Sequence, residues 1–258
     1  MPSVNDTTPS AGSSTSNNVV SFGPISVPVP NVKFPSAYGI NLASGDTDLY
    51  TVPAGRNALL FDVIFTDPTT AVSAFAEVKS AGVYHIFDFI NLGSTGLSGQ
   101  SNSVVPFLLH AGESFSVNTN NTGISVWPYI MEFDASAPIF DARLFSLNAG
   151  SNTLFTVPAG KTITFLNFGS NFNLPLIGQV YYFNKSGATR TVQINAIPNA
   201  GSASTANAVF NTTVSNNSIA SSPNVPHLYG GLNPGDFINV NSDASTATQT
   251  AWVIYTTQ

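Results

Sequence analysis

The chain has 258 residues and a formal net charge of −6 at pH 7. Only 8% of its residues are charged, compared with roughly 25% in ordinary soluble domains, and the few basic residues are scattered, which argues against direct nucleic-acid binding. It has 43% hydrophobic residues and no cysteine, and neither a membrane-spanning apolar run nor a signal peptide is evident, so we expect a folded protein with a neutral surface and without disulfides.

The first 38 residues differ in composition from the rest. Ser, Thr, Asn and Pro dominate as far as Asn18, and prolines then punctuate residues 23–30. Proline fixes its φ angle and cannot donate a backbone hydrogen bond, so this stretch is typical of an extended chain. We therefore predict an extended, low-complexity N-terminal arm over residues 1–38.

From residue 39 onward, short apolar or alternating segments are bounded by Gly, Pro, Asn and Asp, which is typical of an all-β sandwich. The first half predicts strands at 48–52, 57–66, 72–79, 83–90, 104–109, 114–118 and 124–133. The second half predicts strands at 154–157, 163–168, 176–184, 189–197, 206–214, 237–241 and 250–256. Ala135-Ser136-Ala137-Pro138 has the composition of a linker.

The two halves repeat each other. The sequence LYTVPAGR at 49–56 returns as LFTVPAGK at 154–161, and AGESFSVN at 111–118 returns as PGDFINVN at 234–241. The fold class is therefore all-β, with two tandem jelly-roll-like antiparallel β-sandwich domains. We place the first sandwich at 39–134, the linker at 135–143 and the second sandwich at 144–258, and we expect its additional residues in the polar stretch 199–223.

Residue types that could carry chemistry are dispersed. His85, His110 and His227 lack the spacing of metal ligands, so we interpret them as core or loop residues. Neither a Gly-x-Ser-x-Gly elbow nor an Asp-x-Asp-x-Asp-Gly calcium loop is present.

Acidic residues could in principle form a glycosidase pair or a calcium site. For the first we considered Asp62, Glu77, Asp88, Glu113 and Glu132, and for the second Asp46, Asp48, Asp236 and Asp243. We interpret the first set as solvated strand or turn positions, because the members are far apart in sequence. We therefore predict no enzyme activity, no catalytic, cofactor-binding or metal-binding residue, and no cofactor.

Trp127 and Trp252 occupy the last predicted strand of their repeats. A tryptophan there can either anchor the core or line a sugar-binding face, and we favour the core.

The two motifs, Tyr/Phe-Thr-Val-Pro-Ala-Gly-Arg/Lys and the later Ala/Pro-Gly-Glu/Asp turn before an alternating strand, resemble those of tailed-bacteriophage virion proteins. Small β-sandwich modules of capsid decoration, head-fibre and tail-fibre proteins share them, together with low charge and absence of cysteine. The resemblance covers both repeats. It implies a virion structural protein, assembled in the host cytoplasm, that has no membrane partner.

The role that this resemblance favours is a capsid decoration or cement (minor capsid) protein. Its N-terminal arm and sandwich edges would bind capsid or tail subunits of the same particle, and it would form a homo-oligomer, with a trimer as one arrangement. The alternative is a tail or head fibre subunit that recognises a host-surface glycan through loops such as 199–223 and aromatic side chains.

Overall fold

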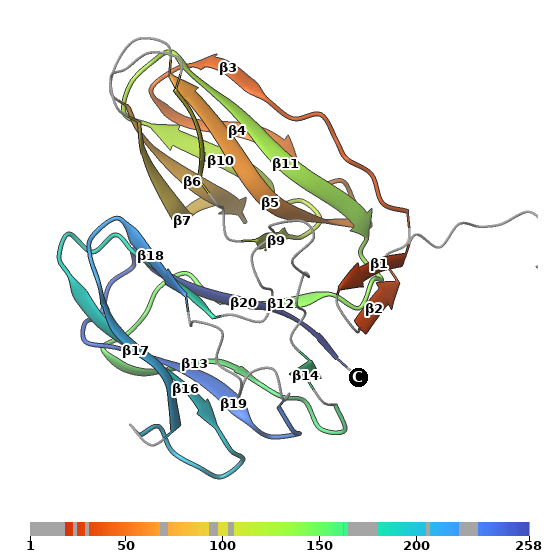
Figure 1. The fold of residues 1–258 in the computed structure, drawn as a ribbon, viewed down its shortest axis with the longest axis vertical. Helices are drawn as coiled ribbons and strands as arrows, with labels where there is room; N and C mark the ends of the chain where they lie inside the picture. Colours follow the sequence, from red (N-terminus) through yellow and green to blue (C-terminus); the bar gives the residue numbers. More distant parts are fainter. Residues whose placement is uncertain are drawn as a thin grey trace, which may run out of the picture.

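The computed structural model describes residues 19–22, 25–28, 31–67, 72–92, 98–102, 106–161, 163–164, 180–204, 207–221 and 232–257. Nearly all of the regular structure in these ranges is β-strand, arranged in four larger antiparallel sheets and one small hairpin. Figure 1 shows the four sheets as two sandwiches, one above the other. The predicted all-β fold with tandem sandwiches is confirmed.

The strands from β3 to β11 form the first sandwich, here called repeat 1. One sheet has the order β3-β11-β5-β8, with β9 also paired to β5, and the other has the order β4-β10-β6-β7. The bounds are β3 Gly39–Leu42, β4 Gly45–Thr51, β5 Arg56–Asp67, β6 Val72–Ser80, β7 Val83–Leu92, β8 Ser98–Asn102, β9 Phe107–Leu109, β10 Ser114–Thr119 and β11 Ile124–Asp134. This strand order is that of a jelly roll.

The strands from β12 to β20 form repeat 2 in the same order. Its sheets are β12-β20-β15-β18, with β14 also paired to β20, and β13-β19-β16-β17. The bounds are β12 Phe140–Leu144, β13 Gly150–Thr156, β14 Ile163–Thr164, β15 Tyr181–Asn184, β16 Arg190–Ile197, β17 Ala208–Val214, β18 Ser218–Ser221, β19 Phe237–Ser242 and β20 Gln249–Thr257. The sequence duplication is therefore a duplication of topology.

The two echoed motifs of each repeat contact each other. In repeat 1 the backbone N–H of Val52 donates to Glu113 and that of Gly112 donates to Val52, at 2.9 Å in both cases. In repeat 2 the N–H of Val157 donates to Asp236 at 2.8 Å and that of Gly235 donates to Val157 at 3.0 Å. The motifs recur because together they close one end of each sandwich.

Two segments that we expected to be irregular contain strands. Val19–Phe22 (β1) and Ile25–Pro28 (β2) form an antiparallel hairpin within the predicted arm, the rest of which up to residue 30 lies outside the described residues. The residues predicted as linker, 135–143, include most of β12, which pairs with β20. Both strands of the hairpin carry the β-branched residues that favour strands. The domain boundaries themselves remain a prediction.

The additional residues of repeat 2 lie in two places. The single long strand β5 of repeat 1 corresponds to β14 and β15 together, which residues 165–180 separate. The tight turn between β6 and β7 corresponds to the longer connection 198–207 between β16 and β17. The expectation that all of the additional length lies in 199–223 was therefore wrong, because it missed the first insertion.

Candidate functional site: the interface between the repeats and an exposed sheet face

The first candidate surface is the contact between the two repeats. The β12-β20-β15-β18 sheet of repeat 2 lies against β7 of repeat 1, near β9 (Figure 1). Trp252 on β20 is 1% exposed and packs against Phe87 and Phe107, with ring centroids 6.1 Å and 5.5 Å away. Its indole Nε1 donates to the carbonyl of Pro106 at 3.2 Å. Trp252 thus fills the side of the first sandwich between β7 and β9.

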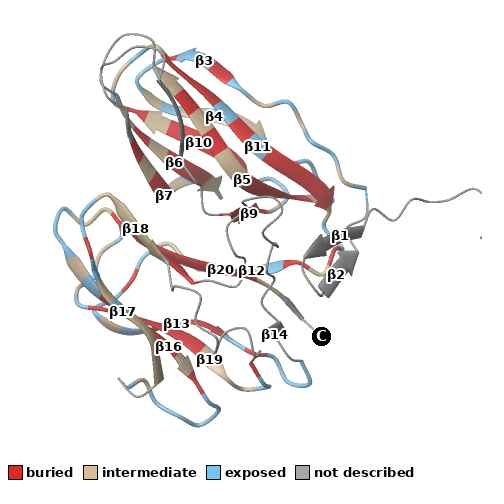
Figure 2. Ribbon diagram, in the orientation of Figure 1, coloured by how far each residue is buried: buried red, intermediate tan, exposed pale blue. Residues whose placement is uncertain are grey.

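Strands β15 and β20 are buried on both faces, as Figure 2 shows for the red stretches of the lower sandwich. Tyr181 and Trp252 face repeat 1, whereas Tyr182 and Val253 face the core of repeat 2. The next residue of β20, Ile254, belongs to a third cluster that contains Met131 and Phe133 of repeat 1 and Ala137 and Ile139 of the connecting segment. One sheet therefore joins three apolar clusters, which holds the repeats in a fixed relation.

Ion pairs surround this apolar contact. The Arg143 guanidinium of β12 lies 2.9 Å from the carboxylates of both Glu113 and Asp141. His110 Nε2 lies 2.7 Å from Asp141 Oδ1. Glu113 and His110 belong to repeat 1, while Arg143 and Asp141 belong to repeat 2, so the network crosses the interface.

Two of the three histidines predicted as core or loop residues, His85 and His110, take part in this interface. His85 stacks on Phe145 with ring centroids 3.8 Å apart. Burial and the nearby Arg143 cation lower the pKa of the His85 imidazole, which favours its neutral form. His110 bridges the repeats through Asp141, and His227 lies outside the described residues.

A group of acidic side chains lies on the outer face of the β4-β10-β6-β7 sheet. Burial and the neighbouring Asp46 carboxylate raise the pKa of Glu77 to about 8. Glu77 Oε2 has no hydrogen-bond partner in the described part of the chain. Lys79 Nζ contacts Asp48 at 2.7 Å, and Lys185 of repeat 2 lies 3.8 Å from the centre of the Phe75 ring. The group is thus partly neutralised by a bound proton and by two lysines.

The other candidate carboxylates have structural partners. Glu132 accepts hydrogen bonds from Tyr50 Oη and Arg56 Nε at 2.7 Å each. Burial alone would raise the pKa of Glu132, but these hydrogen bonds and the arginine charge lower it below its ordinary value. Burial raises the pKa of Asp88 to about 7. Asp236 accepts backbone N–H groups of Asn199 and Asn233, both at 2.9 Å, which fixes a turn.

We expected the five glycosidase candidates to be solvated, and this was wrong for four of them. Glu77, Asp88, Glu113 and Glu132 are all less than 9% exposed. Arginines neutralise the buried carboxylates of Glu113 and Glu132. Burial raises the pKa values of Glu77 and Asp88, which favours their uncharged acid forms. Within the described ranges, no three His, Cys, Asp or Glu side chains are grouped so that they could hold a metal ion.

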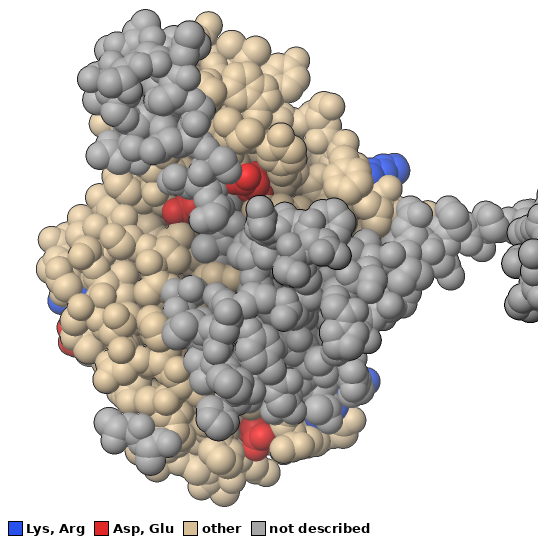
Figure 3. All heavy atoms as spheres, in the orientation of Figure 1, with Lys and Arg blue, Asp and Glu red and all other residues tan. Residues whose placement is uncertain are grey.

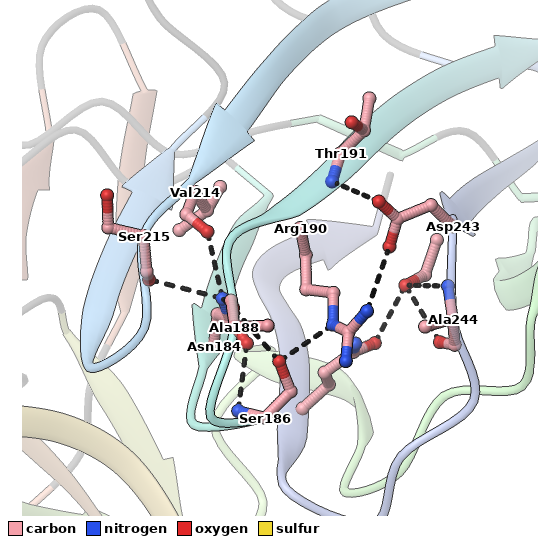
Figure 4. Close-up of polar contacts among 11 residues, drawn as sticks. Asn184, Ser186, Ala188, Arg190, Thr191, Val214, Ser215, Asp243 and Ala244 are labelled. Atoms are coloured by element: carbon pink, nitrogen blue, oxygen red, sulfur yellow. Dashed lines mark hydrogen bonds and ion pairs between the residues drawn. The ribbon is translucent and has the colours of Figure 1, made fainter.

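Figure 4 shows a polar cluster at one end of repeat 2. The Asn184 side-chain amide donates to the carbonyls of Ala188 and Val214 at 2.9 and 2.8 Å. Arg190 donates to Ser186 Oγ at 2.7 Å, and Asp243 accepts the N–H of Thr191 at 2.8 Å. These groups tie three loops together through mutual hydrogen bonds, so the cluster is structural.

The second candidate surface is an exposed face of repeat 1, here called the aromatic face, formed by Tyr38, Ile40, Trp127 and Tyr129. These side chains are 60%, 58%, 37% and 56% exposed, and they lie on β3, on β11 and on the residue before β3. Trp127 therefore contradicts the preference for the core, whereas Trp252 confirms it. Charged side chains are sparse on the surface in general, as the view in Figure 3 illustrates.

Comparisons with known proteins assign no family. No protein-family model and no curated protein matches the chain. A solved structure described as "Crystal Structure of the STIV MCP" aligns with a TM-score of 0.32 and 8% identity, over 88% of this chain and 96% of that chain. A second, described as the atomic structure of Sulfolobus Turreted Icosahedral Virus, aligns with a TM-score of 0.28 and 12% identity, over 88% of this chain and 59% of that chain. The described residues contain no helix that is long and apolar enough to cross a membrane.

Proposed function

We propose that the chain is a non-enzymatic structural protein of a virus particle, and specifically a decoration or cement (minor capsid) protein. The observation that carries this proposal is that two jelly rolls are locked into one block by a buried sheet, while an aromatic sheet face is left uncovered. Such a block suits a role in which fixed geometry and contact area matter more than chemistry. Large exposed apolar patches typically mark interaction sites.

The charge distribution supports attachment by apolar contact. Arg56 and Arg143 are 12% exposed and are engaged in ion pairs within the chain. Few charges are thus left to bind a partner. We expect attachment to capsid subunits that depends little on salt, because ionic strength screens exposed charges but leaves apolar contacts intact.

The N-terminal arm would add to this attachment by lying along a neighbouring subunit, as extended segments do when they add a strand to a sheet edge. From residue 31 onward the folded body holds the chain, because the Asn31 side chain donates to Asp134 and its carbonyl accepts from Arg56. Val32 and Ala37 pack on buried clusters, and Lys33 forms a backbone bridge with Glu132. A deletion of residues 1–30 therefore removes most of the arm and leaves these contacts in place.

The test is co-sedimentation of the purified protein with particles that lack it. We expect the full chain to bind at low and at high salt, and the chain without residues 1–30 to bind more weakly. Failure of the full chain to bind any particle would contradict the proposal. If the truncated chain binds as well as the full chain, the arm does not contribute to attachment, and the sandwich edges alone would account for it.

The exposed aromatic side chains also favour a second candidate, a tail or head fibre subunit that binds a host-surface glycan. Trp127 and Tyr129 stand on the same strand and face, and aromatic rings of this kind can stack on sugars. A glycan array together with a cell-binding assay separates the two functions. A decoration protein binds particles and ignores cells, whereas a fibre subunit binds a defined glycan.

A further inference from the structure

We propose that the aromatic face of repeat 1 docks on the outer edge of repeat 2, at β17, in a second copy of this chain. The inference rests on the structural role proposed above, for which it names a partner. The two repeats differ in what covers this face, and the isolated protein is sufficient to test the proposal.

The two tryptophans occupy equivalent faces of their repeats. Trp127 lies on β11 opposite Ile64 of β5, and Trp252 lies on β20 opposite Tyr181 of β15. In each repeat this last strand lies next to the first strand of the same sheet. The neighbours Val126 and Val253 point into the cores of their own sandwiches. Both tryptophans therefore point outward from the corresponding sheet.

Of these two faces, the one in repeat 2 is covered and the one in repeat 1 is exposed. In repeat 2 the outward side chains Tyr181, Phe183 and Trp252 are each at most 2% exposed, because repeat 1 covers them. In repeat 1, Trp127, which corresponds to Trp252, and Tyr129 on the same strand are 37% and 56% exposed. The same face of the sandwich is therefore packed against the other repeat in repeat 2 and left exposed in repeat 1.

The covered face of repeat 2 packs on an edge strand of repeat 1. The covered face of repeat 2 contacts β7, which is the edge strand of the β4-β10-β6-β7 sheet. The strand in the same position of repeat 2 is β17, which among the described strands pairs only with β16. Asn211 and Thr213 on β17 are exposed, and Figure 1 shows this strand on the side of repeat 2 away from repeat 1. One chain therefore exposes the aromatic face of repeat 1 and the edge strand β17 of repeat 2, which are the counterparts of the two surfaces that contact each other between the repeats.

The aromatic face has the residue types of a protein interface and adjoins the contact between the repeats. Asp62 of β5 lies opposite Tyr129 and is an acidic neighbour of the aromatic face. The face itself is formed by tryptophan, tyrosine and isoleucine, and the first two are enriched at the centres of protein interfaces. On β11 it continues directly into Met131 and Phe133, which repeat 2 and the connecting segment already bury. A free edge strand such as β17 also offers unpaired backbone groups to a neighbour. A head-to-tail contact between copies covers both surfaces and leads to a ring or to an open chain of copies.

The first test is the molar mass of the intact protein by light scattering after gel filtration. We expect wild type to exceed its monomer mass of 27.0 kDa. Replacing both Trp127 and Tyr129 with serine should weaken self-association at least about tenfold, as removal of central aromatic contacts does. The matched control is Val83→Ser, because Val83 is 55% exposed but lies at the turn between β6 and β7, outside the aromatic face. Circular dichroism verifies that each variant is folded.

The second test locates the partner surface by cross-linking, which is clean because the chain has no cysteine. A mixture of the Tyr129→Cys and Asn211→Cys proteins should form a disulfide-linked dimer on mild oxidation, whereas Val83→Cys mixed with Asn211→Cys should not. A monomeric wild type, an unchanged mass after loss of both aromatic residues, or preferential linkage of Tyr129→Cys to itself would overturn the proposal. Glycan binding by a monomer that is lost with Trp127 would assign the face to a sugar instead. None of these results affects the particle-binding test.

Discussion

Truncation of Trp252 to alanine should destabilise the whole protein, because this side chain contributes to the contact between the repeats. It is 1% exposed, contacts the rings of Phe87, Phe107 and Tyr181, and donates a hydrogen bond to Pro106. Removal of a buried tryptophan costs about 3–5 kcal/mol, and loss of the hydrogen bond is part of that cost. We therefore expect the free energy of unfolding to fall by about 4 kcal/mol.

The matched control is Trp127→Ala, the same substitution on the equivalent strand of repeat 1. Trp127 is 37% exposed, so its loss should cost less than about 1 kcal/mol in the monomer. Urea unfolding followed by circular dichroism, at a concentration low enough to keep the chain monomeric, measures both values. If the two substitutions cost the same, the sheet of repeat 2 does not support repeat 1 as described.

Three further predictions concern charges and turns. Because the pKa of Glu77 rises from 4.5 to about 8 on folding, the folded chain holds a proton that the unfolded chain releases, and the free energy of unfolding should fall as pH rises between these values. Glu77→Gln should flatten this part of the curve of unfolding free energy against pH. An unchanged slope in the variant would contradict the raised pKa. Arg143→Ala should lower the free energy of unfolding by about 3–5 kcal/mol, because it leaves the Glu113 and Asp141 carboxylates without the arginine cation. In the same urea titration Arg190→Ala should lower it by less than about 1 kcal/mol, because the ion pair between Arg190 and Asp243 is 4.0 Å long. Gly55 and Gly160 have φ angles of 75° and 71°, so alanine at either should cost about 1–2 kcal/mol, and clearly unequal melting shifts would show that the two turns are not equivalent.

The duplication and the strand pattern were sufficient to predict the fold class. Alternation of apolar and polar residues reports which side of a strand faces its own core, and the turns of Gly55 and Gly160 mark where strands end. The repeated motifs also predicted two similar sandwiches, although not that the motifs bond to each other.

The contact between the repeats was not predicted, although a signal for it was present. Tyr181-Tyr182-Phe183 and Trp252-Val253-Ile254 are continuous apolar runs, and such runs are typical of strands that are buried on both faces. β11 carries a similar apolar run from Val126 to Met131 although Trp127 and Tyr129 are exposed, so such a run did not by itself identify the covered strand. The residue type of the two tryptophans is the same, so only their surroundings in space distinguish a buried from an exposed one.

The strand that joins the three apolar clusters has a consequence for biosynthesis. β20 spans Gln249–Thr257, and the ribosome makes it after every strand that it contacts. Until it emerges, Phe87 and Phe107 lack the indole that covers them. The nascent protein therefore exposes an incomplete apolar surface on repeat 1 from the synthesis of β11 until that of β20.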